Sequence, residues 1–203
     1  MKKVGSTMEI TIKKLTAELS ADYFDFFDNR AFTDDSPYRC YCQTYQLSRE
    51  QGEKLMEDTR DIDPGFLCKN VAKQQIETGA LCGYLAYVDG ISVGWCNAND
   101  RSSFPSEPYY DVLFYSPIPK REIAVVCFEI APEYRGKGIA TALLDKVILD
   151  AKTNNYASVV AFPVKRSERY EWDCAGPIHL YEKAGFHKIS EHGETIIMKK
   201  QLV

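Results

Sequence analysis

The sequence predicts a single mixed α/β sheet flanked by helices, and three observations carry this prediction. Asp89-Gly90 stands between two apolar runs, which is the strongest short-range signal of a β-hairpin. The apolar run Ile123 to Ile130 leads into a glycine-flanked basic turn and then into an amphipathic helix. A second pair of short strands, joined by His192-Gly193-Glu194, closes the chain. Helices between strands, together with two hairpins, are typical of one sheet covered by helices.

The first half of the chain is expected to place two helices beside three strands. Ser20 suits the N-cap of the first helix, and Gly79 stops the second one. The region 33–65 between them is polar and aromatic, and it is expected to be irregular. The expected strands are 9–15, 81–88 and 91–97, and the expected helices are 20–32 and 66–77.

The second half begins with segment 99–120, whose prolines, serines and tyrosines predict a long loop near the active site. Pro177 suits the first turn of a short helix, and Gly185 ends it. The longer helix after the glycine turn carries apolar residues at every fourth position, which predicts a buried face: Ile139, Leu143, Val147 and Ala151. The expected strands are 121–130, 156–164, 186–190 and 195–199, and the expected helices are 137–152 and 177–185.

Length and composition favour one soluble, cytoplasmic domain that spans 1–203. A hydrophobic content of 45% supplies a substantial core, and a charged fraction of 27% fits an ordinary surface. The net charge of −4 argues against nucleic acid or an anionic membrane as the main partner. No apolar stretch is long enough to span a bilayer, and the N-terminus lacks the apolar segment of a signal peptide. The 7 cysteines, an odd number, are therefore expected to be reduced thiols.

The turn Arg135-Gly136-Lys137-Gly138-Ile139-Ala140 carries the strongest functional signal. Backbone N–H groups in the first turn of a helix lack helical partners, and with the positive end of the helix dipole they form an anion site. The two glycines let a phosphate approach the backbone, because no Cβ blocks the way. A plain helix start would be expected to carry a Ser, Thr or Asp cap, and none stands there. The turn therefore predicts phosphate binding.

This hexapeptide resembles the Arg/Gln-x-x-Gly-x-Gly/Ala signature of the GNAT acetyltransferase superfamily, and it stands between the strand and the helix expected there. Downstream, Leu180-Tyr181-Glu182-Lys183-Ala184-Gly185-Phe186 resembles the short helix and final strand entry of the same superfamily. The resemblance covers about 9–199 and is sharpest from 123 to 187. It implies a mixed, mostly antiparallel sheet of six or seven strands with about four helices, in which strands 121–130 and 156–164 splay apart.

For acetyl-CoA, the resemblance implies a donor site with two parts. Backbone N–H groups of the turn would hold the pyrophosphate, and the end of the preceding strand would pair with the pantetheine arm inside the gap. The acceptor amine would then attack the thioester directly in a ternary complex, without a metal. The expected contacts are Arg135, Gly136, Lys137, Gly138, Ile139 and Ala140 for the pyrophosphate, and Phe128, Glu129 and Ile130 for the pantetheine arm.

Tyr181 is the candidate general acid, because a phenol with a pKa near 10 can protonate a departing thiolate. An aromatic residue beside Ile178 and Ala184 on a short helix also fits the core. The general base stays open. Glu129 lies in the key strand with a solvated or capping role as its alternative, and Glu122 is either a base acting through water or a surface carboxylate. An amine that arrives deprotonated needs no base.

No metal site is expected from the cysteines and histidines. Cys40-x-Cys42 has a one-residue spacer, shorter than that of a zinc knuckle. Cys174 stands where many GNATs carry Asn, seven residues before the tyrosine. We expect it to pack, and transient attachment of the acetyl group is the alternative. The histidines show no ligand spacing with the cysteines: His179, His187 and His192.

The expected function is an acetyl-CoA-dependent N-acetyltransferase that acts on a primary amine. The expected acceptor is a small molecule rather than nucleic acid or a membrane component. Aromatic residues of 38–45 and 104–115, with Trp95 and Trp172, either shape the acceptor pocket or complete the core. Two other functions stay open, a non-catalytic acyl-CoA-binding or sensor domain and a protein N-terminal or lysine acetyltransferase. The size of the acyl group and the oligomeric state, for which a homodimer is one outcome, stay open as well.

Overall fold

A computed structural model describes residues 8–33, 40–114, 121–166 and 174–202. These residues form a seven-stranded sheet with the order β1-β2-β3-β4-β5-β7-β6. Its strand pairs are antiparallel except β4 with β5, which confirms the mixed, mostly antiparallel fold. The strands are β1 Ile10–Lys14, β2 Gly83–Val88, β3 Ile91–Asp100, β4 Glu122–Ile130, β5 Ser158–Ala161, β6 His187–His192 and β7 Thr195–Gln201.

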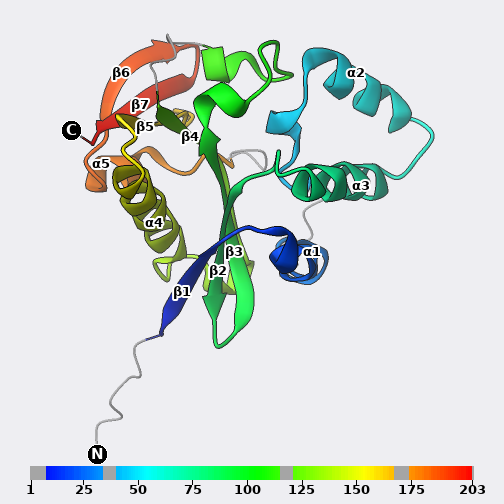
Figure 1. Ribbon diagram of the computed structural model, residues 1–203, viewed down its shortest axis with the longest axis horizontal. Coiled ribbons are helices and arrows are strands. Elements are labelled where there is room, and N and C mark those ends of the chain that lie inside the picture. Colours follow the sequence, from blue (N-terminus) through cyan, green and yellow to red (C-terminus); the bar gives the residue numbers. More distant parts are fainter. Residues whose placement is uncertain (1–7, 34–39, 115–120, 167–173, 203) are drawn as a thin grey trace, which may run out of the picture.

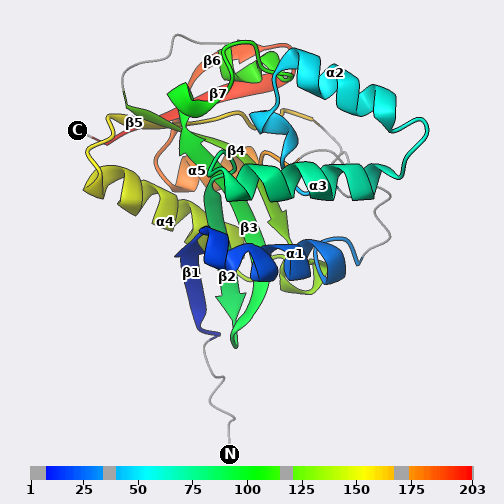
Figure 2. The ribbon, with the colours of Figure 1, turned by 45° about the vertical axis from the view of Figure 1, so that its right-hand side comes forward.

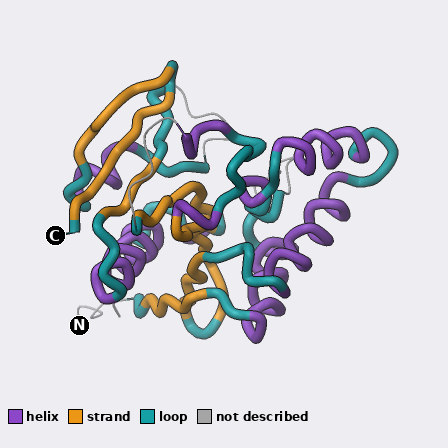
Figure 3. The backbone as a smooth tube through the Cα atoms, turned by 45° about the horizontal axis from the view of Figure 1, so that its top comes forward, coloured by secondary structure: helices purple, strands orange, loops and turns teal. Residues whose placement is uncertain are grey.

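Helices lie on both sides of the sheet (Figures 1 and 2). Those of the first half of the chain gather on one side of the central strands and α4 lies on the other, as the tube in Figure 3 also shows. No described helix is long and apolar enough to cross a membrane. The helices are α1 Ser20–Asn29, α2 Arg49–Asp58, α3 Pro64–Glu77, α4 Ile139–Thr153 and α5 Ile178–Lys183.

Two hydrophobic clusters form the core, one on each face of the sheet. On the α1 and α3 face, Trp95 packs edge-on against Tyr23, with ring centroids 5.0 Å apart. On the other face, α4 and α5 bury their apolar residues against the strands. The fourfold spacing in α4 correctly predicted its buried side: Ile139, Leu143, Val147 and Ala151.

The central strands separate where a gap was expected. β4 pairs with β5 over four positions, from Glu122 opposite Ser158 to Val125 opposite Ala161. β5 then ends, while β4 continues to Ile130. The expected strand 156–164 was therefore too long, and the second half of β4 runs beyond the parallel pairing. This half of β4 forms one wall of the site described below.

The region expected to be irregular contains a helix, α2. Ser48 begins it with a capping box, in which Ser48 Oγ accepts from the Gln51 N–H at 3.2 Å and Gln51 Oε1 accepts from the Ser48 N–H at 3.0 Å. These reciprocal bonds pair backbone groups that a helix start leaves open. The prediction of irregular structure was wrong here because α2 is mostly polar and has few apolar residues, with Gly52 and Leu55 as its buried residues.

A disulfide contradicts the expectation that all cysteines are reduced. Cys42 and Cys127 are bonded, with their Cα atoms 6.7 Å apart. The bond ties residues 40–47, here called the 40–47 segment, to β4. On β3, Asn97 Nδ2 donates to Cys42 O at 2.9 Å, and the Asn97 and Gln46 side-chain amides also bond to each other. The 40–47 segment is thus fixed across the two central strands.

Candidate active site

The turn between β4 and α4 leaves an open concavity at the start of the helix. Gly136 and Gly138 have φ of +74° and +87°, a region that favours glycine. Ideal Cβ atoms placed on either residue would meet nothing within 4 Å. Gly138 is the N-cap of α4, and no side chain caps the helix. The N–H groups of the first turn and the helix dipole therefore face a space that an anion can enter.

Arg135 is held at the edge of this concavity by the end of β4. Its Nε donates to Ile130 O at 3.1 Å, and its Nη2 lies 3.4 Å from Glu129 Oε1. Glu129 Oε1 also accepts from the Ile130 N–H at 3.2 Å. The Lys137 ammonium stands over the Tyr134 ring, 5.2 Å from its centroid. Two cations therefore flank the glycine turn, and the Glu129 carboxylate serves to orient one of them.

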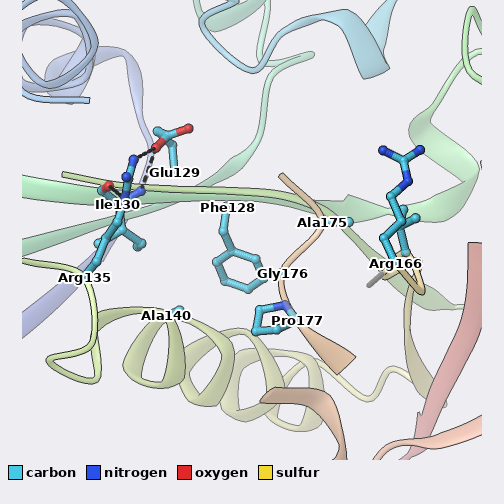
Figure 4. A pocket seen from close by; sticks show the side chains of 10 residues that line it. Phe128, Glu129, Ile130, Arg135, Ala140, Arg166, Ala175, Gly176 and Pro177 are labelled. Atoms are coloured by element: carbon cyan, nitrogen blue, oxygen red, sulfur yellow. Dashed lines mark hydrogen bonds and ion pairs between the residues drawn. The ribbon is translucent and has the colours of Figure 1, made fainter. Parts of the chain in front are cut away.

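A cavity of about 370 Å³ extends from this turn along β4. In Figure 4, Phe128 points toward α4, which carries Ala140, and toward Pro177 before α5, while Glu129 points to the opposite side of β4. The cavity therefore lies between the end of β4, the start of α4, the residues after β5 and the segment before α5. Its lining residues are Phe128, Glu129, Ile130, Arg135, Ala140, Val164, Arg166, Ala175, Gly176 and Pro177.

Five of the nine expected donor-site residues line this cavity, and five lining residues were missed. The expected ones that do not line it are Gly136, Lys137, Gly138 and Ile139, which form the turn and the first position of α4. The missed residues lie after β5 or before α5. For the second group the sequence offered one signal, Gly176-Pro177, a pair that marks a break before a helix. Arg166 is fixed by Glu194, with Nε 2.8 Å from Oε2.

Residues 174–176 occupy the space beside β4. The Phe128 N–H donates to Cys174 O at 2.6 Å. This amide belongs to the part of β4 that was expected to pair with pantetheine, and the Ile130 carbonyl there already accepts from Arg135. A ligand that pairs with β4 at Phe128 must therefore take over a bond that the protein makes to itself.

Tyr181 is fully buried, yet its hydroxyl reaches the cavity wall. The hydroxyl donates to Ala175 O at 2.5 Å, and Ala175 lines the cavity. Its ring packs beside Phe128 and Phe186, with centroids 6.5 and 5.3 Å away. Burial raises the pKa of Tyr181 well above its usual value of 10, and the nearby Cys96 and Cys174 add to this. The phenol thus keeps its proton at neutral pH, and the side chain belongs both to the core and to the wall of the site.

Glu122 is not a surface carboxylate and is a poor candidate for a base. It is fully buried, with Oε2 2.7 Å from an Arg101 Nη1 and Oε1 2.6 Å from Lys199 Nζ. Ser158 Oγ donates to the same Oε1 at 2.7 Å. Both of its oxygens are thus bonded inside the core, and the carboxylate does not line the cavity described above, so it is a poor candidate for a base that contacts an acceptor amine there. The expectation that Glu122 is a surface carboxylate was wrong.

The thiols and aromatic residues near β4 mostly complete the core. Cys174 Sγ lies 4.0 Å from the Tyr45 hydroxyl, and burial raises the pKa of Cys40 to about 12, so Cys40 stays a thiol at neutral pH. Trp95 is buried under α1, so of its two expected roles it completes the core, and Trp172 lies outside the described residues. Tyr45 instead packs against the partly exposed Tyr110, with centroids 4.9 Å apart. No three His, Cys, Asp or Glu side chains in the described ranges are grouped to hold a metal ion.

The chain matches a known family and known structures. The profile of the family described as "Acetyltransferase (GNAT) family" matches residues 43–186. A PaiA N-acetyltransferase from Thermoplasma acidophilum, solved with coenzyme A, has a TM-score of 0.56 at 17% identity over 96% of this chain and 99% of its own. YncA of Salmonella typhimurium, a putative acetyltransferase solved with acetyl-CoA, has a TM-score of 0.53 at 14% identity over 96% and 94%. No curated protein sequence matches the chain.

Proposed function

The chain belongs to the acetyltransferase (GNAT) family, and from this premise we propose that it transfers the acetyl group of acetyl-CoA to the primary amine of a small molecule. One observation carries the proposal. A cavity runs from Arg135, beside the uncapped start of α4, to Ala175, whose carbonyl accepts a hydrogen bond from the Tyr181 hydroxyl. The cavity therefore connects the expected anion site with the carbonyl that holds the expected proton donor, an arrangement that suits an acyl thioester of a nucleotide.

The donor site fits acetyl-CoA on the structure of the turn itself. The space beside Gly136 and Gly138 is open, because a Cβ on either residue would meet nothing within 4 Å, and it adjoins the N-terminus of a helix of 15 residues. Backbone N–H groups of the turn and the Arg135 guanidinium would hold the pyrophosphate. We assign the pantetheine arm to the Phe128 N–H, where it would replace Cys174 O. Structural relatives that carry coenzyme A or acetyl-CoA support this assignment.

Tyr181 supplies the proton for the leaving thiolate in this proposal. The Tyr181 hydroxyl donates a hydrogen bond to Ala175 O, and its raised pKa keeps the phenol protonated at neutral pH. A positioned general acid contributes about 10²- to 10⁴-fold to a rate. We assign no base, because Glu122 is committed to two cations and Glu129 to Arg135. The acceptor amine would arrive already deprotonated, and the proton that its nitrogen loses after the attack would restore the Tyr181 phenol.

A small acceptor is favoured by the 40–47 segment. The disulfide and Asn97 fix this segment across β3 and β4 on the face opposite α4. Tyr45 of the segment lies against Cys174, directly beside the gap. The segment therefore narrows the approach to the gap from that face, which suits a compact amine better than a folded protein surface.

Release of free thiol from acetyl-CoA tests the proposal, measured across a panel of polyamines, amino-sugar amines, amino-acid derivatives and N-terminal peptides. Mass spectrometry of the products identifies the acetylated amine. We expect turnover with a small amine and binding of CoA by calorimetry. Turnover with peptides alone would overturn the small-molecule part, and absence of both turnover and CoA binding would overturn the whole proposal.

A matched pair of variants tests the phosphate turn. Gly138→Glu places a carboxylate at the start of α4, where it opposes a pyrophosphate. Gly193→Glu is the control, because Gly193 in the β6–β7 turn also has a positive φ and open space around its Cβ position. We expect at least a tenfold weaker acetyl-CoA affinity for Gly138→Glu alone. Equal affinity of both variants would remove the turn from the donor site.

A further inference from the structure

Gly176 passes between two side chains of the site. Its φ is +79°, and a Cβ placed on it would lie 3.2 Å from Phe128 Cδ2 and 3.4 Å from the Tyr181 hydroxyl oxygen. The contact with Phe128 is tighter than an ordinary van der Waals separation, and the contact with the Tyr181 hydroxyl is at the lower limit of one. A methyl group there would therefore displace the Phe128 ring or the segment by a few tenths of an ångström, and the segment carries the carbonyl that holds the Tyr181 hydroxyl. The absence of a side chain at this position therefore determines how closely Phe128 and Tyr181 approach the segment.

The two residues before Gly176 bind the same two neighbours through their carbonyls. Cys174 O accepts from the Phe128 N–H at 2.6 Å, and Ala175 O accepts from the Tyr181 hydroxyl at 2.5 Å. The segment 174–176 thus contacts Phe128, on the cavity wall that would receive acetyl-CoA, and the Tyr181 hydroxyl, which is assigned as the acid. Ala175, Gly176 and Phe128 all line the cavity, as Figure 4 shows.

We propose that Gly176 is a positioning residue for the acetyl transfer, which sets the place of the Tyr181 hydroxyl at the cavity wall by having no side chain there. This inference rests on the proposed function, because it takes Tyr181 to be the general acid. Gly176 acts through Tyr181 and touches no reacting atom itself.

The effect should appear mainly in kcat. A proton donor acts on the leaving group in the transition state, so misplacing its hydroxyl lowers kcat more than it changes the binding of acetyl-CoA. A displacement of 1 Å at an active site costs about 100-fold in rate, so a few tenths of an ångström should cost about tenfold. We therefore expect Gly176→Ala to lower kcat about tenfold, with KM for acetyl-CoA changed less than threefold.

Gly90 provides the control for the backbone. It lies in the β2–β3 turn with the same φ of +79°, and a Cβ there would meet nothing within 4 Å. Gly90→Ala and Gly176→Ala therefore carry the same conformational cost, that of an alanine at positive φ. They differ in the contacts that the new methyl group makes. A loss of kcat in Gly176→Ala alone separates positioning from a simple need for glycine in the backbone.

A double-mutant cycle tests whether Gly176 acts through the hydroxyl. The variants are Gly176→Ala, Tyr181→Phe and the two combined, measured by thiol release with a productive amine. We expect Gly176→Ala to lower kcat about tenfold in the Tyr181 enzyme and less than twofold in the Tyr181→Phe enzyme. An equal loss in both backgrounds, or a kcat for Gly176→Ala equal to that of Gly90→Ala, would overturn the inference while leaving Tyr181 as the acid. Full activity of Tyr181→Phe would overturn the acid assignment first and the role of Gly176 with it.

A further variant keeps the test open if Gly176→Ala does not fold. Phe128→Leu removes the ring that lies 3.2 Å from the new methyl group and leaves the hydroxyl contact at 3.4 Å. Compared with Phe128→Leu alone, the combination with Gly176→Ala should still lose about tenfold in kcat. Equal kcat values for these two enzymes would overturn the inference.

Discussion

Replacing Glu122 by Gln is expected to destabilise the protein strongly, because it removes a charge and keeps the shape. The Glu122 side chain is 0% exposed, and it bonds Arg101, Lys199 and Ser158. The Arg101 side chain is also 0% exposed and cannot turn to water, whereas Lys199 is 14% exposed and partly can. The substitution therefore removes a counter-charge from a buried guanidinium.

The size of the effect follows from the two charge-assisted bonds that are lost. Each such bond contributes about 1.5–3 kcal/mol, and breaking a buried ion pair from one side costs about 3–5 kcal/mol. Since Lys199 retains some access to water, we expect a loss of about 3–5 kcal/mol in the free energy of unfolding. With an m-value near 2.5 kcal/mol/M, the urea midpoint should fall by about 1–2 M.

Urea unfolding followed by circular dichroism measures this shift. Glu57→Gln on α2 is the control, because Glu57 is exposed and lies 3.7 Å from an equally exposed Arg60. It should change the free energy of unfolding by less than about 0.5 kcal/mol. Acetyl transfer by folded Glu122→Gln should persist at low temperature. Unchanged stability with a large loss of kcat would refute the reasoning and restore Glu122 as a base.

Two other predictions concern pH and redox state. Above pH 10 the unfolded tyrosines ionise while buried ones keep their protons. The free energy of unfolding should therefore fall by about 1.4 kcal/mol per pH unit for each tyrosine whose pKa burial raises well above 10. Tyr23, Tyr45 and Tyr181 are among these tyrosines. Their stabilisation is complete below pH 10, and urea midpoints that stay constant from pH 9 to pH 11 would contradict this. The disulfide between Cys42 and Cys127 closes 85 residues, so a reductant should lower the free energy of unfolding by about 4–5 kcal/mol. The double serine variant at these positions should not respond to reductant, and equal midpoints of the natural protein with and without reductant would argue against the bond.

Local signals account for what the sequence predicted well. The buried face of α4 follows from fourfold spacing within one helix, and the β2–β3 hairpin from the dipeptide Asp89-Gly90. The glycine turn is equally local, since its two positive φ values lie within three residues. Each of these features is determined by residues close together in the chain. The capping box of α2 was local too, but its helix is mostly polar and buries few apolar residues.

Contacts between distant residues account for what the sequence did not predict. The burial of Glu122 depends on Arg101 and Lys199, which lie on either side of it in the chain and carry no shared pattern. Similarly, the bond from the Phe128 N–H to Cys174 O joins residues that only the fold brings together. Propensity and periodicity describe single elements, so neither reports which partner a buried group will meet.

We propose that Tyr181 protonates the thiolate that leaves acetyl-CoA, and the kcat of Tyr181→Phe measures this role. Calorimetry of CoA binding on the same variant shows whether the donor site is intact, and Tyr156→Phe at a partly exposed tyrosine on the far side of α4 controls for loss of a hydroxyl. We predict that kcat falls by about 10²- to 10⁴-fold while the Kd for CoA stays within about threefold. An unchanged kcat with the same amine would contradict the account.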